Sequence, residues 1–193
     1  MIIKYLLLGL LASVVPAAAN TFFVSIDTST VSGVTGSLFF FYGPGLAPVD
    51  PATATINGFS GGTLGAVLIP GGTGVLPATL TMDNSAPVSY QQAITFGSKI
   101  SFFLSLTGPA VSNPSPGAIG GTDLALFLLD AGDGPLPIDD SDGQVFDASI
   151  VPNTGQTSIA GQPVVTSVLL PEPGSMLLLL SGVGMVGWRL RRR

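Results

Sequence analysis

The 193-residue chain contains no cysteine and no histidine, which excludes disulfide frameworks, zinc sites built on these residues, and Ser-His-Asp or Cys-His catalytic groups. Only 9% of its residues are charged, against about 25% in typical soluble domains. Between Asn20 and Leu170, ten aspartates face a single basic residue, Lys99. Such a body lacks the clustered Lys and Arg side chains that bind phosphate, so we expect no nucleic-acid partner.

The N-terminus has the three parts of a secretory signal peptide. Lys4 provides positive charge, and residues 5–15 form an apolar stretch of 11 residues. Small side chains follow, so we predict cleavage by signal peptidase after Ala19, with Ala17 and Ala19 recognised and Asn20 as the new terminus. A short membrane anchor or a buried helix is the alternative, which the length disfavours because a span needs about 20 residues. The body is therefore expected to be exported.

The next 151 residues, 20–170, consist of short runs rich in Val, Phe and Thr, separated by clusters of Gly and Pro. Several runs alternate apolar and polar residues, which is typical of half-buried strands. In one of them Ile100, Phe102 and Leu104 fall on one face and Ser101 on the other. The predicted strands are residues 21–27, 36–42, 53–59, 77–83, 90–96, 99–108, 122–130, 144–151 and 163–170.

The segments between these runs favour turns over helices. Residues 58–65 and 69–77 are rich in Gly, and we interpret them as linkers. They lack the lysine of a phosphate-binding loop. No stretch of the body keeps a helical apolar pattern over a normal helix length. The sequence thus predicts an all-β body, an antiparallel β-sandwich or jelly roll.

An aspartate-rich segment between residues 130 and 147 is the strongest local sign of chemistry in the body. Calcium prefers hard oxygen ligands on turns, so the candidate metal ligands are Asp130, Asp133, Asp139, Asp140 and Asp142. The spacing departs from an EF-hand, since Ile138 stands at the first position and Ser149 at the twelfth. Asp and Gly are also common turn residues. A turn-forming role therefore competes with a calcium-dependent carbohydrate-binding module.

We predict no enzymatic activity, no catalytic residues, and no cofactor apart from the calcium just considered. Glycoside hydrolysis needs two carboxyl groups at a defined separation. The ten aspartates contain many pairs, but none in a recognisable arrangement, so a polysaccharide hydrolase is the least favoured alternative. The aromatic residues of segment 36–42 are assigned to the core and to edge packing rather than to a sugar-stacking platform.

The C-terminus combines a Pro-Glu-Pro motif, an apolar stretch and a basic tail. The apolar stretch, residues 174–188, has 15 residues. As a helix it would be about 22 Å long, shorter than a hydrocarbon core of about 30 Å. The tail should keep this end in the cytoplasm by the positive-inside rule, through Arg189, Arg191, Arg192 and Arg193. Together with the signal peptide, this predicts a precursor held in the inner membrane with its body exported.

This C-terminal arrangement resembles the PEP-CTERM sorting signal of Gram-negative bacteria, with Pro171, Glu172 and Pro173 as the motif. The resemblance covers residues 171–193. It implies recognition by exosortase, a membrane-embedded cysteine protease or transpeptidase that would cut near the motif and free the body for the cell surface. It also implies an association with exopolysaccharide in biofilm and floc formers.

The body resembles PEP-CTERM proteins that carry a β-rich region of undefined function. Segments 24–40, 52–65 and 94–110 carry this resemblance, and it implies no catalytic residues.

Three other C-terminal signals compete with this interpretation. Residues 170–174 read Leu-Pro-Glu-Pro-Gly and lack the threonine that sortase attacks. A GPI-type signal ends in apolar residues, whereas this chain ends in arginines. A plain one-span anchor stays open, because local bilayer thinning tolerates short spans. Our leading hypothesis is a non-enzymatic surface or matrix protein with a signal peptide (1–19), an extracellular body (20–170) and a sorting signal (171–193).

Overall fold

The computed structural model describes residues 19–138, 142–161 and 165–170. In these residues the chain forms one ten-stranded sheet, in which every printed strand pair is antiparallel. The all-β, antiparallel prediction is therefore confirmed. The predicted signal helix and C-terminal transmembrane helix lie outside the described residues. The strands are β1 (Asn20–Asp27), β2 (Thr35–Pro44), β3 (Thr53–Ile69), β4 (Thr73–Gly74), β5 (Leu80–Asp83), β6 (Val88–Thr107), β7 (Thr122–Asp130), β8 (Gln144–Ile150), β9 (Thr157–Gly161) and β10 (Val165–Leu170).

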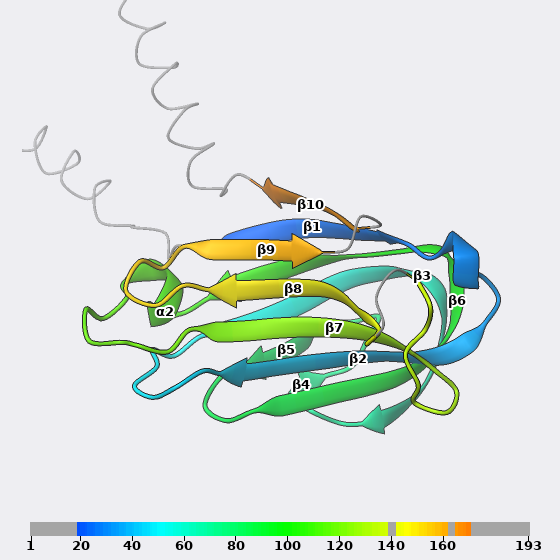
Figure 1. The fold of residues 1–193 in the computed structure, drawn as a ribbon, viewed down its shortest axis with the longest axis horizontal. Coiled ribbons are helices and arrows are strands. Elements are labelled where there is room, and N and C mark those ends of the chain that lie inside the picture. The colour runs from blue at the N-terminus through cyan, green and yellow to red at the C-terminus, as the bar shows by residue number, and fades with distance from the viewer. Residues whose placement is uncertain (1–18, 139–141, 162–164, 171–193) are drawn as a thin grey trace, which may run out of the picture.

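Two long strands, β3 and β6, allow this single sheet to fold back on itself. The β1 half consists of β10, β1, residues 99–107 of β6, residues 53–60 of β3, β5 and β4. The β2 half consists of residues 62–69 of β3, residues 88–96 of β6, β2, β7, β8 and β9. Figure 1 shows β9, β8, β7 and β2 side by side in front, with β1 and β3 behind them.

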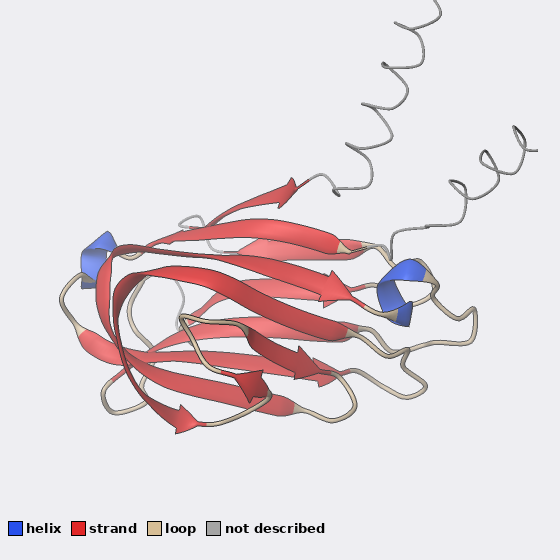
Figure 2. Cartoon of the chain, turned by 180° about the vertical axis from the view of Figure 1, so that it is seen from behind, coloured by secondary structure: helices blue, strands red, loops and turns tan. Residues whose placement is uncertain are grey.

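Two short helices complete the described part of the chain. They are η1 (Ser29–Val31) and α2 (Pro109–Ser112), and they lie at opposite ends of the sheet (Figure 2). Neither is long and apolar enough to cross a membrane.

The sheet folds over where glycines of β3 face β6. Gly61 and Gly62 have φ angles of +104° and +144°, which side chains disfavour. A Cβ atom on Gly61 would lie 1.8 Å from the carbonyl oxygen of Lys99. The pairing register shifts at this point, as expected for bulges that bend a strand. Segment 58–65, which we predicted to be a linker, is thus the bent middle of β3, and that prediction is wrong.

The core lies between the inner faces of the two halves. Leu38, Phe40 and Tyr42 of β2 all point into it and are 0% exposed. Phe102, on the β1 half, meets Phe40 and Phe146 of the β2 half edge to face, with ring centroids 5.9 and 6.1 Å apart. Each such aromatic pair is worth about 0.5–1.5 kcal/mol beyond the area it buries.

Several strand boundaries differ from the predicted ones. The predicted strands 90–96 and 99–108 are one strand, β6. β3 continues to Ile69, past its predicted end at residue 59. β9 was not predicted, because its residues are exposed or half-buried and show no apolar alternation. By contrast, β7 has the predicted bounds of residues 122–130.

Candidate functional site

The two predicted processing junctions lie at neighbouring strand ends. β1 begins at Asn20, directly after Ala19, and β10 ends at Leu170. The two strands pair antiparallel, with Thr21 opposite Leu170. Asn20 is held in place by a hydrogen bond from its Nδ2 to Oγ1 of Thr157, 3.1 Å long. Ala17, the Pro-Glu-Pro motif and the C-terminal arginines lie outside the described residues.

The first two predicted calcium ligands lie at the end of β7 and in the turn that follows it. Oδ1 of Asp130 accepts hydrogen bonds from the backbone N–H groups of Gly132 and Gly134, each 2.8 Å long. Asp133 has a positive φ of 62°, and its Oδ1 accepts a 2.7 Å hydrogen bond from Nε2 of Gln91. These bonds are of the kind by which Asp stabilises turns.

The remaining predicted ligands are not brought to the same place by the described structure. Oδ1 of Asp142 accepts a 3.0 Å hydrogen bond from the backbone N–H of Gln144, again a turn contact. Asp139 and Asp140 lie outside the described residues. Within the described ranges, no group of three or more acidic side chains is placed to share a metal ion. Calcium binding stays a prediction.

A shallow cleft of about 160 Å³ lies beside the Asp130–Asp133 turn. Gln91 is almost buried, at 6% exposed, and also donates a 2.9 Å hydrogen bond to Oγ of Ser37. It thereby ties the turn to the outer face of β2. Thr35, Ser37 and Leu68 line the cleft together with the turn.

A row of outward-facing residues crosses five strands of the β2 half. Residues that are direct partners in neighbouring strands share a face of the sheet. Phe41 is opposite Ser89 of β6 and Ala125 of β7, Ala125 is opposite Asp147 of β8, and Asp147 is opposite Ala160 of β9. The small Ala125 therefore lies between the larger side chains of Phe41 and Asp147.

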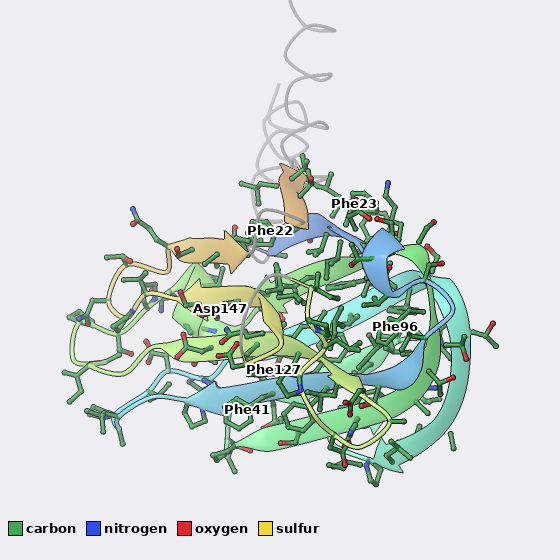
Figure 3. All side chains as sticks on the ribbon, turned by 45° about the vertical axis from the view of Figure 1, so that its right-hand side comes forward. Phe22, Phe23, Phe41, Phe96, Phe127 and Asp147 are labelled. Carbon is green, nitrogen blue, oxygen red and sulfur yellow. The ribbon has the colours of Figure 1, made fainter. Side chains whose placement is uncertain are left out.

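Two further side chains complete the surroundings of Ala125. Phe127 and Asp123 lie two residues away along β7, on the same face. The ring of Phe127 packs at a tilt against Phe39 of β2, with centroids 5.9 Å apart. Figure 3 shows Phe41, Phe127 and Asp147 on neighbouring strands. We call this set the Ala125 trough: Phe41, Asp123, Ala125, Phe127 and Asp147.

Asp147 is the electrostatically unusual member of the trough. It is half-buried, and its Oδ1 is buried without a hydrogen-bond partner among the described residues. Burial raises the pKa of the Asp147 carboxyl group, and the nearby charge of Asp123 raises that pKa further. An unpaired buried carboxylate oxygen is costly, so the ionised form of Asp147 is disfavoured in the folded protein.

The hydroxyl group of Tyr42 is the second buried polar group without a described partner. Burial raises its pKa far above the usual range, and the charge of Asp83 adds to the effect. Tyr42 lies on the inner face of β2 with 0% of its surface exposed, so it belongs to the core.

A larger cleft of about 370 Å³ lies between residues 44–53 and the turn after β5. The most deeply buried polar residue in its lining, Asn84, is fully engaged. Its Oδ1 accepts from the backbone N–H of Ala52 at 2.8 Å, and its Nδ2 donates to the backbone oxygen of Asp50 at 2.9 Å and to Oγ1 of Thr122 at 2.7 Å. Asn84 thus holds the loop to the sheet, and we assign it a structural role.

Sequence reasoning missed the Ala125 trough. Phe41 had been assigned to the core or to edge packing, yet it is 37% exposed on the outer face. The signal was present in the alternation of β2, where Phe39 and Phe41 fall opposite Leu38 and Phe40. The partner strands, which place Asp147 beside these rings, could not be read from that alternation.

Comparison with known proteins does not narrow the fold family or the function of this chain. No protein-family model matches the chain, and neither a curated protein nor a solved structure is significantly similar to it.

Proposed function

We propose that this chain is an exported, non-enzymatic protein of the bacterial surface or extracellular matrix, sorted by exosortase through a PEP-CTERM signal. The observation that supports the proposal is the position of the strand ends. β1 begins at Asn20 and β10 ends at Leu170. Cleavage after Ala19 would therefore leave β1 and the rest of the described sheet intact.

In this proposal the two terminal segments serve the precursor, and the folded sheet is the mature product. The body is then a scaffold of the β-sandwich type, at the cell surface or in exopolysaccharide around the cell. Pro171, Glu172 and Pro173 are the motif that exosortase recognises. The apolar stretch holds the precursor in the inner membrane for a time, and its orientation is set by Arg189, Arg191, Arg192 and Arg193.

Intact mass spectrometry of the protein from cells that produce exosortase tests this proposal. We expect a mature product that lacks the N-terminal 19 residues and ends near the Pro-Glu-Pro motif. A product that still carries residues 174–193 would rule out the processing step. Alanines in place of Pro171, Glu172 and Pro173 should retain the protein in the membrane fraction, whereas a Val183→Leu control should be released normally.

A calcium-dependent carbohydrate-binding module is the second candidate function. It is favoured by the cleft beside Asp130 and Asp133, where Gln91 fixes one carboxylate. Calorimetry of the chain with calcium decides this candidate. Heat of binding that Asp133→Asn abolishes would support it, and the absence of both heat and a rise in melting temperature would remove it.

A polysaccharide hydrolase is the least supported alternative. Asp123 and Asp147 are the aspartate pair to test, because one has a raised pKa and the other lies close enough to influence it. Release of reducing sugar from the host's exopolysaccharide, lost in Asp147→Asn, would revive this alternative.

A further inference from the structure

We propose that the end of the sheet beside α2 contacts the lipid surface of the membrane in the precursor, through three exposed apolar side chains. We call these residues the apolar tip: Leu46, Ile119 and Leu169. The partner is a bilayer of zwitterionic lipid, which the tip enters at the boundary between head groups and acyl chains. The inference rests on the membrane hold of the proposed function, that is, on residues 174–188 in the inner membrane. It adds how the folded body lies against that membrane.

The apolar tip comprises the three most exposed large apolar side chains among the residues that the structure describes. Leu46 is 80% exposed, Ile119 is 66% exposed and Leu169 is 57% exposed. Scattered exposed apolar residues are normal on protein surfaces. A group of them at one end of a molecule instead marks an interaction site.

Two of these side chains come from loops that contact each other. The loops are residues 45–52, between β2 and β3, and residues 113–121, between α2 and β7. The backbone N–H of Ile119 donates a 3.1 Å hydrogen bond to the carbonyl oxygen of Pro48. Figure 1 shows both loops at the same end of the sheet as α2. Leu46 and Ile119 are therefore exposed on neighbouring turns at this end.

The loops that carry the tip are fixed to the sheet. The buried side chain of Asn84 binds the backbone of Ala52 and Asp50 at 2.8 and 2.9 Å. Gly120 packs so closely that a Cβ atom there would lie 1.9 Å from the carbonyl oxygen of Leu46. Because the loops are ordered before any contact, little conformational entropy is lost when they meet a partner.

The route of the chain indicates a bilayer as the partner of this end. β10 ends at Leu170, opposite Thr21 of β1. Thr21 is in turn opposite Ser105 of β6, just before β6 leads into α2. The chain therefore leaves the sheet at the α2 end on its way to the apolar stretch.

The distance from this strand end to the apolar stretch is short. Only Pro171, Glu172 and Pro173 separate Leu170 from residues 174–188. Even fully extended, this connection reaches at most about 14 Å. A membrane that holds the apolar stretch must then lie next to the α2 end, where the apolar tip can enter its boundary layer.

Charge favours a zwitterionic over an anionic lipid surface. Attraction to anionic lipid requires clustered Lys and Arg side chains. The only basic residue of the body, Lys99, lies opposite Asp27 at the η1 end of the sheet. Asp50 and Asp83 lie at the α2 end, where they line the cleft beside loop 45–52. Contact with the membrane must therefore come from apolar burial rather than from charge.

Quenching of tryptophan fluorescence by brominated lipid tests the contact. The full-length chain is reconstituted into zwitterionic vesicles whose acyl chains carry bromine near the head group. The single tryptophan, Trp188, belongs to the apolar stretch and reports whether that stretch is in the bilayer. Leu46→Trp in a Trp188→Phe background reports on the tip. We expect the Leu46→Trp probe to lose most of its emission in these vesicles and none in vesicles of unbrominated lipid.

Val34→Trp in the same background is the matched control. Val34 is 40% exposed and lies beside η1, at the opposite end of the sheet, so this probe should not be quenched. Both replaced side chains are exposed, and circular dichroism checks that the fold is retained. If Leu46→Trp is quenched no more than Val34→Trp, the proposal is wrong. A blue shift of the Leu46→Trp emission without quenching would instead assign the tip to a second copy.

The contact and the membrane hold can fail separately. Quenching of Leu46→Trp without quenching of Trp188 in the wild-type chain would support the contact and overturn the hold. Quenching of Trp188 without quenching of Leu46→Trp would leave the hold standing and overturn the contact. Quenching of Leu46→Trp that is as strong in vesicles of anionic lipid would overturn the preference for zwitterionic lipid.

Discussion

At the scale of single residues, the pKa values of aspartates in this protein are shifted in opposite directions by their surroundings. Asp27 and Asp83 are exposed at strand ends, and hydrogen bonds from Ser29 and Ser85 lower the pKa of each carboxyl group. Asp147 lies half-buried on the sheet face, where burial raises its pKa. The first two stabilise turns in their ionised form, whereas an ionised Asp147 opposes folding.

Asp147→Asn should therefore make the free protein more stable near neutral pH. The folded state holds the Asp147 proton at higher pH than the unfolded chain does. Between the unfolded and folded pKa values, stability thus falls as pH rises. Because the carboxyl group is only half-buried, solvent screening limits the gain to about 1 kcal/mol or less.

Thermal unfolding of both proteins from about pH 7 down to the ordinary pKa of an aspartate, about 4, checks this expectation. The advantage of the variant should shrink as the pH is lowered and the wild-type carboxyl group gains its proton. The lowered pKa values of Asp27 and Asp83 act in the opposite direction, but they are common to both proteins and cancel in the difference. A difference that does not change with pH would contradict the assignment of this effect to Asp147.

At the scale of elements, β3 is the strand on which the architecture depends. Its first part pairs within the β1 half and its last part within the β2 half. The glycines between them are needed because the backbone of β6 approaches too closely for a side chain. A glycine-rich stretch can therefore be the bend of a long strand, and composition alone does not distinguish this from a linker.

Gly61→Ala should cost several kcal/mol of folding free energy or prevent folding. The added Cβ would lie 1.8 Å from the Lys99 carbonyl oxygen. Steric overlap of this size causes large losses of stability. Gly33→Ala is the control. Gly33 also has a positive φ, of 82°, but nothing lies within 4 Å of the added Cβ, so only the backbone penalty of about 1–2 kcal/mol applies. Urea unfolding of both variants makes the comparison. Equal losses would show that close approach does not govern this position.

At the scale of the whole molecule, one core joins the two halves of the folded sheet. Phe102 lies at its centre, in contact with aromatic rings from β2 and β8. Its neighbour Phe103 points outward and packs on Phe23 at the surface. Adjacent residues of one strand thus have different energetic roles, since alternate side chains face opposite sides.

Phe102→Ala should destabilise the protein by about 3–5 kcal/mol, because it removes a buried ring and leaves a cavity. Phe103→Ala should cost about 1 kcal/mol, the average for point substitutions, because this ring is half-buried against Phe23 outside the core. The denaturant midpoints of the two variants measure this difference in stability. Similar losses would mean that the two halves are not joined by the aromatic cluster around Phe102.

Most of the strands, and the inward faces of those that alternate, could be predicted from the sequence. The alternation that includes Ile100, Phe102 and Leu104 correctly identified the buried face of β6, because burial of one face imposes a period of two. The turn role of Asp130 also follows from local chemistry, since the partner N–H groups lie within four residues.

The Ala125 trough and the fold-over of the sheet depend on long-range strand pairing and could not be predicted. Ala125 lies between Phe41 and Asp147 because β7 pairs with β2 on one side and with β8 on the other. Those partners are far apart in the sequence, and their register depends on how the whole sheet closes around its core. Local pattern indicates which way a side chain points, and long-range pairing determines what lies beside it.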